Sequence, residues 1–239
     1  MSQPSRVIKA VFFDFMGTCL DWHSSVLRAT PKEIPQKDAS ELALQWRQQY
    51  FAENTKRIQQ GLGPENIDQT LARALDIVLE QRTADKEKLD SDTKIRMVRA
   101  WHSQLAWPDV HGAMQKLRKD VGLEVFVHAN GTTRLQLDLT RSSGLAFNML
   151  FSSQLLGTYK PSREAYEKAL QLIGLQPEEV VMVAAHAYDL RGAQRVGMKT
   201  IYIHRWTDDV DENMEHVKTE FDVYLEDMSS LPDKIENMG

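Results

Sequence analysis

The chain has 239 residues, 42% of them hydrophobic and 26% charged, so it can bury one large core or a core plus a smaller domain. Its net charge of −5, without a long basic block, argues against nucleic acid as the main partner. The single cysteine, Cys19, can form no disulfide within the chain, and the polar residues 1–6 with the short apolar run behind them match neither a signal peptide nor a membrane span. We therefore expect a soluble cytoplasmic protein.

The first predicted strand is the apolar run 7–13. It is apolar on both faces except at Lys9, as expected for a strand buried inside a parallel sheet. Asp14 follows at once, before a turn that contains Gly17 and Thr18. The strand therefore delivers one carboxylate to its end.

A helical stretch follows, from residue 23 to residue 106. Apolar residues recur there at helical spacing, and Gly61 with Pro64 separates the first helix from the second. Three helices are predicted, at 38–61, 66–81 and 91–105. No strand pattern interrupts them.

From Asp109 onward, helical and strand patterns alternate. The predicted strands are 124–129, 148–152, 180–185, 200–204 and 222–225. The predicted helices are 110–119, 132–143, 162–173, 189–196 and 229–237. This order predicts an α/β fold with a doubly wound parallel sheet, formed by residues 1–22 and 107–239. The helical insert, residues 23–106, begins at the carboxyl end of the first strand and is expected to cover it as a cap domain.

Polar residues follow four of the predicted strands. They are Asp14 and Thr18, Asn130 and Gly131, Lys160, and the segment His186 to Asp189. Singly, each has a structural explanation, as a turn former, a left-handed residue before glycine, a solvated lysine or an acid at a helix N-terminus. No structural need places all of them at successive strand ends, so together they predict a functional site at that edge of the sheet.

At these positions the sequence resembles the haloacid dehalogenase superfamily, and most closely its 2-haloacid dehalogenases. "FFDFMGT" (12–18) resembles the first motif of that superfamily, "FVHANG" (126–131) the second, "YKPSREAY" (159–166) the third and "VMVAAHAYD" (181–189) the fourth. "QWRQQY" (45–50) matches the Trp-Arg-Gln segment of the dehalogenase cap. The resemblance covers about residues 7–227.

This resemblance implies hydrolysis of a small 2-haloacid to a 2-hydroxy acid through an aspartyl ester. Asp14 is then the nucleophile that displaces halide. Lys160 keeps Asp14 ionised, and Asp189 orients or deprotonates the water that hydrolyses the ester. The resemblance also suggests a homodimer.

The departing halide needs a cradle, and the resemblance assigns it to Arg47, Asn130 and Tyr188. Thr18 is counted with these binding residues. Tyr166 also matches a site position of the family, although a helix over 162–173 could bury it as core. Arg47 has a structural alternative as well, as a surface residue of an amphipathic helix.

Met16 stands where phosphatases of this superfamily carry a second acid, which protonates a leaving alcohol. A departing halide needs no proton, so Met16 favours dehalogenation and is expected to shape an apolar pocket. Magnesium is not expected, because few carboxylates are available to bind it and Lys160 supplies the positive charge. No cofactor is expected.

Three residues depart from the dehalogenase pattern: Ala129, Ala184 and His186 stand where serine, serine and asparagine are usual. His186 is expected to bond Asp189 or the water and to titrate near neutrality, or else to be a packed ring without a role. Because Ala129 and Ala184 lack the hydroxyls of those serines, a substrate other than a simple haloacid stays open. Two alternatives to dehalogenation also stay open, a phosphatase of small metabolites and a protein that keeps the fold without catalysis.

Overall fold

The sheet is built around the first strand. The computed structural model describes residues 8–238, so residues 1–6, on which the expectation of no signal peptide depends, lie outside the described part. Strand β1 (Ala10–Phe13) lies inside a six-stranded parallel sheet with the order β5-β4-β1-β6-β7-β8. The other strands are β4 (Glu124–Ala129), β5 (Met149–Ser152), β6 (Val180–Ala184), β7 (Lys199–Ile203) and β8 (Val223–Leu225).

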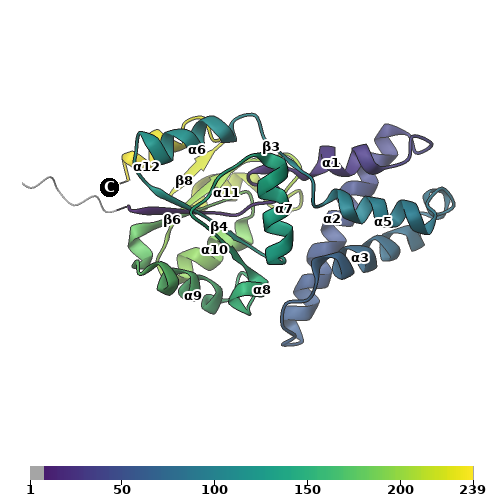
Figure 1. The fold of residues 1–239 in the computed structure, drawn as a ribbon, viewed down its shortest axis with the longest axis horizontal. Coiled ribbons are helices and arrows are strands. Elements are labelled where there is room, and N and C mark those ends of the chain that lie inside the picture. Colours follow the sequence, from purple (N-terminus) through teal and green to yellow (C-terminus); the bar gives the residue numbers. More distant parts are fainter. Residues whose placement is uncertain (1–7, 239) are drawn as a thin grey trace, which may run out of the picture.

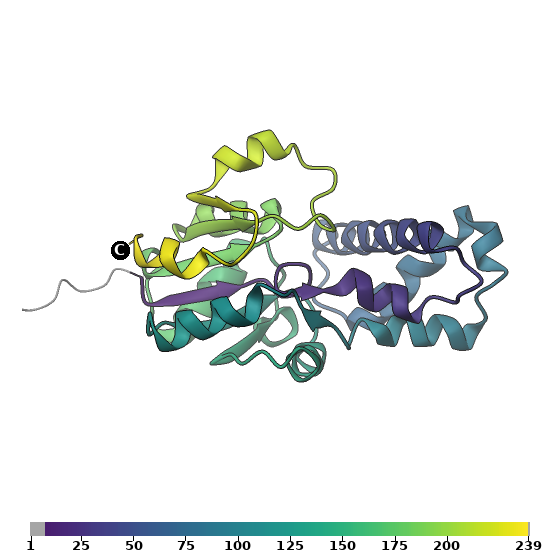
Figure 2. The same ribbon diagram turned by 90° about the horizontal axis from the view of Figure 1, so that it is seen from above.

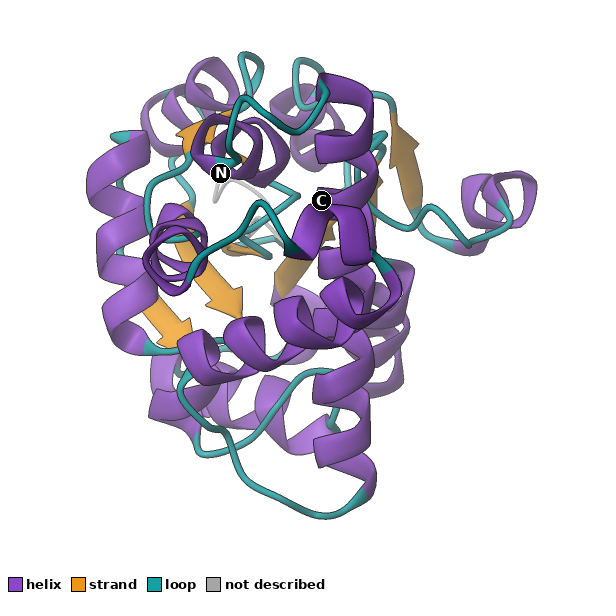
Figure 3. Ribbon diagram, turned by 90° about the vertical axis from the view of Figure 1, so that its right-hand side faces the viewer, coloured by secondary structure: helices purple, strands orange, loops and turns teal. Residues whose placement is uncertain are grey.

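Helices cover both faces of this sheet (Figures 1 and 3). One face packs on α6 (Val110–Lys119), α7 (Thr133–Ser143) and α12 (Leu231–Glu236). The other packs on α9 (Arg163–Ile173), α10 (Ala187–Val196) and α11 (Met214–Glu220), with α8 (Ser153–Leu156) and the 3₁₀ helix η1 (Pro177–Glu179) in the connections. Along β1, Val11 and Phe13 join the first core and Phe12 joins the second. The doubly wound α/β fold is confirmed.

The strand order places the predicted site. From β1 the chain continues to β4 and β5 on one side, then crosses to β6, β7 and β8 on the other. The sheet therefore reverses its direction of winding at β1, and ligands of such sheets bind at this point, beyond the carboxyl ends of the strands. The residues that follow β1, β4 and β6 meet there.

The helical insert extends from that same end of the sheet (Figure 2). It leaves through β2 (Leu20–Asp21) and returns through β3 (Leu105–Ala106), which pair antiparallel. Between them lie α1 (Trp22–Ala29), α2 (Gln36–Gln59), α3 (Ile67–Gln81), α4 (Thr83–Lys86) and α5 (Ser91–Ala100). The apolar core of the insert is continuous with that of the sheet face that carries α6 and α7. The limits 23–106 for a separate cap domain stay a prediction.

The third helix expected in the insert was too long, because α5 ends at Ala100 and not near Leu105. Leu105 lies in β3, which follows the last helix of the insert, so no strand interrupts the described helices themselves, as expected. The pairing of β3 with β2 requires extended backbone there. The short helices α1, α4, α8 and α11 were missed, since each is too short to show clear helical periodicity. Three of them are marked by a capping side chain, such as Asp21 of α1, and α4 has none.

Specific polar contacts join the insert and its connections to the sheet domain. Trp107 donates its indole N–H to the Gly17 carbonyl, at 2.8 Å. Arg205, after β7, binds both carboxylate oxygens of Asp109 at 2.8 and 3.1 Å. The first contact holds the segment that returns from the insert against the loop that carries Asp14, and the second joins that segment to Arg205, which also donates to the Thr18 carbonyl of the same loop. None of the described helices is long and apolar enough to cross a membrane.

His102 bridges the insert and the sheet domain. Its Nε2 lies 2.8 Å from Asp68 of α3, and its Nδ1 lies 2.9 Å from Asp138 of α7. The hydrogen bond to Asp68, together with that to Asp138, raises the pKa of His102 above its ordinary value. The charged ring thus ties α3 to α7.

We predict that His102→Asn lowers the free energy of unfolding most at low pH. Because the folded pKa of His102 is raised, its contribution is complete below the unfolded pKa of about 6.5 and is lost as the pH rises through the folded pKa. For this partly exposed group the pH-dependent difference should be roughly 1 kcal/mol. Urea denaturation of both proteins across that pH range measures it, and a difference that does not change with pH contradicts the bridge.

Candidate active site

Asp14 lies at the end of β1, where three side chains bind its carboxylate. Its backbone N–H still donates to Val183 of β6, at 3.0 Å, which continues the sheet to this residue. Its Oδ1 accepts from the Lys160 ammonium at 2.9 Å. Its Oδ2 accepts from the Thr18 hydroxyl at 2.7 Å and from Nδ1 of His186 at 3.0 Å.

Lys160 is buried, with 2% of its side chain exposed, between two carboxylates. Its ammonium donates to Asp14, to Asp189 and to the His128 carbonyl. Asn130 holds the backbone of Lys160 on both sides, since its amide donates to the Lys160 carbonyl at 3.0 Å and accepts from the Lys160 N–H at 2.9 Å. The loops after β4 and β5 therefore fix the ammonium against the end of β1.

These charges determine the ionisation of the site. Burial alone would raise the pKa of Asp14, but the cations of Lys160 and His186 hold it well below its usual range. Burial would likewise lower the pKa of Lys160, and Asp14 and Asp189 raise it instead. Burial raises the pKa of Asp189, and Asp14 adds to this. Asp14 is therefore a carboxylate and Lys160 an ammonium.

Asp189 points toward Lys160 and away from solvent. The Tyr166 hydroxyl lies 2.6 Å from its Oδ1 and 2.9 Å from its carbonyl oxygen. A side-chain carbon at Gly192, one helical turn from Asp189, would lie 2.5 Å from that hydroxyl, so glycine leaves room for Tyr166. Tyr166 is fully buried and does not line the cavity described below; it contacts the site through Asp189.

The two carboxylates do not form a metal site of the usual kind. The Lys160 ammonium already lies between Asp14 and Asp189, where a bridging cation would have to bind. Among residues 8–238, no group of three or more His, Cys, Asp or Glu side chains is arranged to hold a metal ion. The residues present do not fit magnesium as a resident cofactor.

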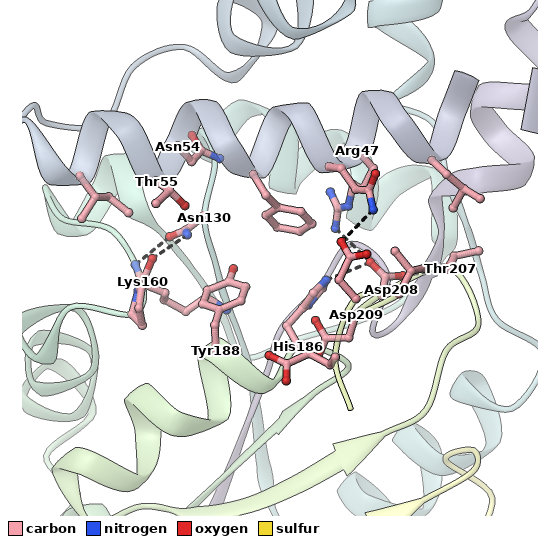
Figure 4. Close-up of a pocket in the computed structure, with 18 of the residues that line it drawn as sticks. Arg47, Asn54, Thr55, Asn130, Lys160, His186, Tyr188, Thr207, Asp208 and Asp209 are labelled. Carbon is pink, nitrogen blue, oxygen red and sulfur yellow. Dashed lines mark hydrogen bonds and ion pairs between the residues drawn. The ribbon is translucent and has the colours of Figure 1, made fainter. Parts of the chain in front are cut away.

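A cavity of about 480 Å³ lies between α2 and the carboxyl end of the sheet (Figure 4). Its lining includes one side of α2, the segment 207–212, and Asn130, Lys160, His186 and Tyr188. Asp14 is not part of the lining and keeps only 8% exposure of its side chain, but Lys160 and His186 bind its carboxylate and do line the cavity. The cavity therefore ends against the groups that hold Asp14.

Arg47 enters this cavity from α2, on the side of His186 and Asp208 (Figure 4). Although it belongs to the insert, only 4% of its side chain is exposed, so it is not the surface arginine that its helix allows. Its guanidinium carbon lies 4.5 Å from the centre of the Phe51 ring and 5.4 Å from that of Trp22. Its Nη2 donates to the Met16 carbonyl at 3.1 Å.

Two of the three guanidinium nitrogens of Arg47 lack hydrogen-bond partners. Within the described part of the chain, buried Nε and Nη1 have none. Leaving the buried N–H groups of a guanidinium without acceptors costs free energy. These N–H groups, surrounded by aromatic rings, form a suitable binding site for a small anion. This corner of the cavity is thus suited to bind a halide or a carboxylate.

The other predicted residues surround the same centre. Tyr188 and Asn130 line the cavity, although the amide of Asn130 is engaged with the Lys160 backbone. Thr18 is buried and bonds Asp14, and it also accepts from the Ala185 N–H at 2.9 Å. Met16 does not line this cavity; it contributes its carbonyl oxygen to Arg47, and its side chain joins the apolar core.

The expectation that His186 bonds Asp189 is wrong. Its Nδ1 binds Asp14, and its Nε2 lies 2.9 Å from Oδ1 of Asp208. The expectation that His186 titrates near neutrality is also wrong. Burial alone would lower the pKa of His186, but Asp14 and Asp208 outweigh this effect and raise it to about 10. The ring is therefore an imidazolium between two carboxylates.

Asp208 was missed in the sequence. It follows β7, and its carboxylate is fully buried beside Arg47 and His186. The rule that identified the other strand ends, applied to β7, points to this segment as well. What it could not show is that the loop folds back over the end of β1.

Comparisons with known proteins agree with this geometry. A family model described as haloacid dehalogenase-like hydrolase matches residues 8–197. The chain is 31% identical to (S)-2-haloacid dehalogenase 4A of Burkholderia cepacia, over 83% of this chain and 84% of that protein. It is 29% identical to haloacetate dehalogenase H-2 of a Moraxella species, over 87% and 90%. The crystal structure of the L-2-haloacid dehalogenase PA0810 matches with a TM-score of 0.80 and 30% identity, over 96% and 99%.

We predict that iodide quenches tryptophan fluorescence in a saturable manner, because Trp22 and Trp101 lie 5.4 and 5.6 Å from the Arg47 guanidinium carbon. Arg47→Gln should weaken this binding about 10- to 100-fold, through loss of hydrogen bonds to a charged group. The exposed Arg99→Gln is the matched control and should behave as wild type. Saturable quenching that survives in Arg47→Gln contradicts an anion seat at this residue.

Proposed function

The chain belongs to the haloacid dehalogenase-like hydrolase family, and from this membership we propose that it hydrolyses a small 2-haloacid to a 2-hydroxy acid and halide. The enzyme acts on the carbon–halogen bond and forms an ester on Asp14. The relatives named as haloacid and haloacetate dehalogenases support this class of reaction.

The observation that carries the proposal is that Arg47 lines the same cavity that ends against Lys160 and His186, the residues that bind the Asp14 carboxylate. Asp14 is an ion-paired carboxylate at the end of β1, and Arg47 offers unpartnered buried N–H groups from α2. Displacement of a halide requires a nucleophile and an anion site at one small cavity, and here the cavity is lined by Arg47 and ends against the groups that hold Asp14.

In the first step, Asp14 attacks the carbon that bears the halogen. A carbon–oxygen bond forms while the carbon–halogen bond breaks, and the halide leaves with the bonding electrons toward Arg47 and Tyr188. Lys160 keeps Asp14 ionised and also neutralises the second carboxylate, Asp189, whose negative charge would otherwise raise the pKa of Asp14.

In the second step, water adds to the carboxyl carbon of Asp14. Asp189 accepts one proton from this water, and burial raises its pKa, which makes it the stronger base of the pair. The tetrahedral intermediate then breaks its bond to the alkoxide oxygen. The alkoxide takes the proton held by Asp189 and leaves as the 2-hydroxy acid, and Asp14 loses the remaining proton and is again a carboxylate.

Met16 separates this reaction from hydrolysis of phosphate esters. A leaving alcohol needs a proton from an acid near the nucleophile, whereas halide leaves without one. In this chain the position two residues after Asp14 holds a buried methionine, so the site lacks an acid there. The proposal therefore includes independence from divalent metal, with Lys160 in the place of a cation.

The proposal also includes a homodimer in the cytoplasm. Cys19 is buried and unpaired, which suits a reducing compartment. The dimer is carried over from the resemblance to the dehalogenases, and light scattering on the purified protein tests it.

Asp14→Asn should abolish halide release, because a neutral amide is a poor nucleophile. Asp189→Asn should still release one halide per site and then stop, because it lacks the base for the second step. Intact-protein mass spectrometry should show an adduct on Asp189→Asn with the mass of the substrate minus halide, located on Asp14. Full turnover by Asp14→Asn would overturn the covalent route.

Halide release should proceed unchanged in EDTA. The Lys160 ammonium neutralises the carboxylates without metal, so a chelator removes nothing that the reaction needs. A halide assay on a panel of 2-haloacids, with EDTA and with added magnesium, makes the comparison. Loss of activity in EDTA that magnesium restores is the outcome that refutes this part of the proposal.

A further inference from the structure

Asp208 is a buried carboxylate to which the steps above assign no role. Its side chain is fully buried and receives four groups. The Trp22 indole N–H and the Thr207 hydroxyl donate to Oδ2, at 3.1 and 2.7 Å. Nε2 of His186 lies 2.9 Å from Oδ1, and Nη2 of Arg47 lies 3.5 Å from the same oxygen. A carboxylate held this completely is fixed in position.

The loop that carries the nucleophile is built around Asp208. Gly17, three residues after Asp14, has φ +88°, and a side-chain carbon there would lie 2.5–2.6 Å from the Asp208 carboxylate. Glycine at this turn therefore allows Asp208 to pack directly against the backbone of the first motif. His186 and Arg47 then meet the carboxylate from the other sides (Figure 4).

The protonation of His186 follows from its partners. Ionised carboxylates only accept hydrogen bonds. Both ring nitrogens of His186 face one, Asp14 at 3.0 Å and Asp208 at 2.9 Å, so both nitrogens carry hydrogen. The ring is an imidazolium because Asp208 occupies its far side.

The two oxygens of Asp14 have different partners. Among the described residues, Oδ1 accepts a hydrogen bond from Lys160 only, whereas Oδ2 accepts from both Thr18 and His186, so Oδ1 is the oxygen that keeps a lone pair for bond formation. Oδ1 is therefore the oxygen that attacks, and Oδ2 becomes the carbonyl oxygen of the ester. When water adds to this ester, negative charge develops on Oδ2, between the Thr18 hydroxyl and the His186 N–H.

We propose that Asp208 is a positioning residue that holds His186 as an imidazolium against Oδ2 of Asp14, where it stabilises the negative charge that develops during hydrolysis of the ester. This assignment rests on the proposed function, because it concerns the second step of the same reaction. It predicts that Asp208 matters for hydrolysis of the ester and little for its formation.

Other charged groups around His186 also influence the pH at which its ring loses a proton. Asp14 and Asp208 bind the ring, and Asp209 lies on the same loop as Asp208. These three carboxylates favour the imidazolium. The opposing cations are Lys160 from the loop after β5 and Arg47 from α2, while Tyr188 and Asp189 follow on α10. Loss of Asp208 removes one of the two directly bonded anions.

Rapid-quench measurement of halide release tests the proposal. Asp208→Asn should show a burst of one halide per site at nearly the wild-type rate, followed by turnover slowed about 10- to 100-fold, the effect of losing a hydrogen bond to a charged group. The basic limb of the rate of ester hydrolysis should lie at lower pH in Asp208→Asn than in wild type, because Asp208 is the anion that stays bonded to His186 once Asp14 has become a neutral ester. Equal slowing of both steps, with no shift of the basic limb, would mean a merely structural role and would overturn the proposal.

Two further variants complete this experiment. Glu215→Gln removes one negative charge from exposed α11, outside the cavity lining, where Glu215 pairs with Lys218, so the burst and the pH profile should remain those of wild type. His186→Gln should slow the second step in the same way as Asp208→Asn, and the double variant should be no slower than His186→Gln alone. Additive losses in the double variant contradict action through His186.

Nitrogen-15 NMR of the free enzyme separates this proposal from the proposed function. The His186 signal, identified by its absence in His186→Gln, should remain that of an imidazolium to about pH 9 or above in wild type and titrate at lower pH in Asp208→Asn. If no 2-haloacid yields halide, the proposed function fails while this titration still decides whether Asp208 holds the charged ring. Titration of His186 near neutrality in wild type refutes the proposal.

Discussion

The active site depends on one buried ammonium, Lys160, shared by the carboxylates of Asp14 and Asp189. Either carboxylate alone would be expensive to bury ionised, and the two together would repel each other. The Lys160 ammonium offsets both the cost of burial and the repulsion. It keeps Asp14 charged although only 8% of the Asp14 side chain is exposed. A carboxylate with little hydration and a defined direction is a better nucleophile than one in water.

Buried positive and negative charges are also paired on the other side of the cavity. His186 and Arg47 add two buried cations, and Asp208 contacts both of them. The buried groups thus pair to neutrality before substrate binds. The unpaired N–H groups of Arg47 are the place where an incoming anion adds to this network. Because α2 supplies Arg47 and the sheet supplies the nucleophile, contacts between the insert and the loop of Asp14, such as that of Arg47 with the Met16 carbonyl, also keep the two halves of the site together.

Much of the fold and the centre of the site could be predicted from the sequence. The alternation of strand and helix patterns predicted the parallel sheet, which the structure confirms. The polar residues at strand ends predicted that Asp14, Asn130, Lys160 and Asp189 lie together, and they do, because parallel strands bring these ends to one edge. The bonding of His186 could not be predicted. Its partner Asp208 is distant in sequence, and only the fold of the loop after β7 over Gly17 brings the two together. The end of α5 was missed for a similar reason, since pairing with β2 overrides local helical pattern.

The central claim is that Asp14 attacks carbon and does not activate water. A single turnover in heavy-oxygen water, with wild-type enzyme in excess over a 2-haloacid, tests it most directly. The covalent route transfers an oxygen of Asp14 to the product and replaces it from water, so the hydroxy acid should be unlabelled and the peptide that contains Asp14 labelled. Labelled hydroxy acid in this first turnover, with an unlabelled Asp14, would contradict the claim and make Asp14 a general base.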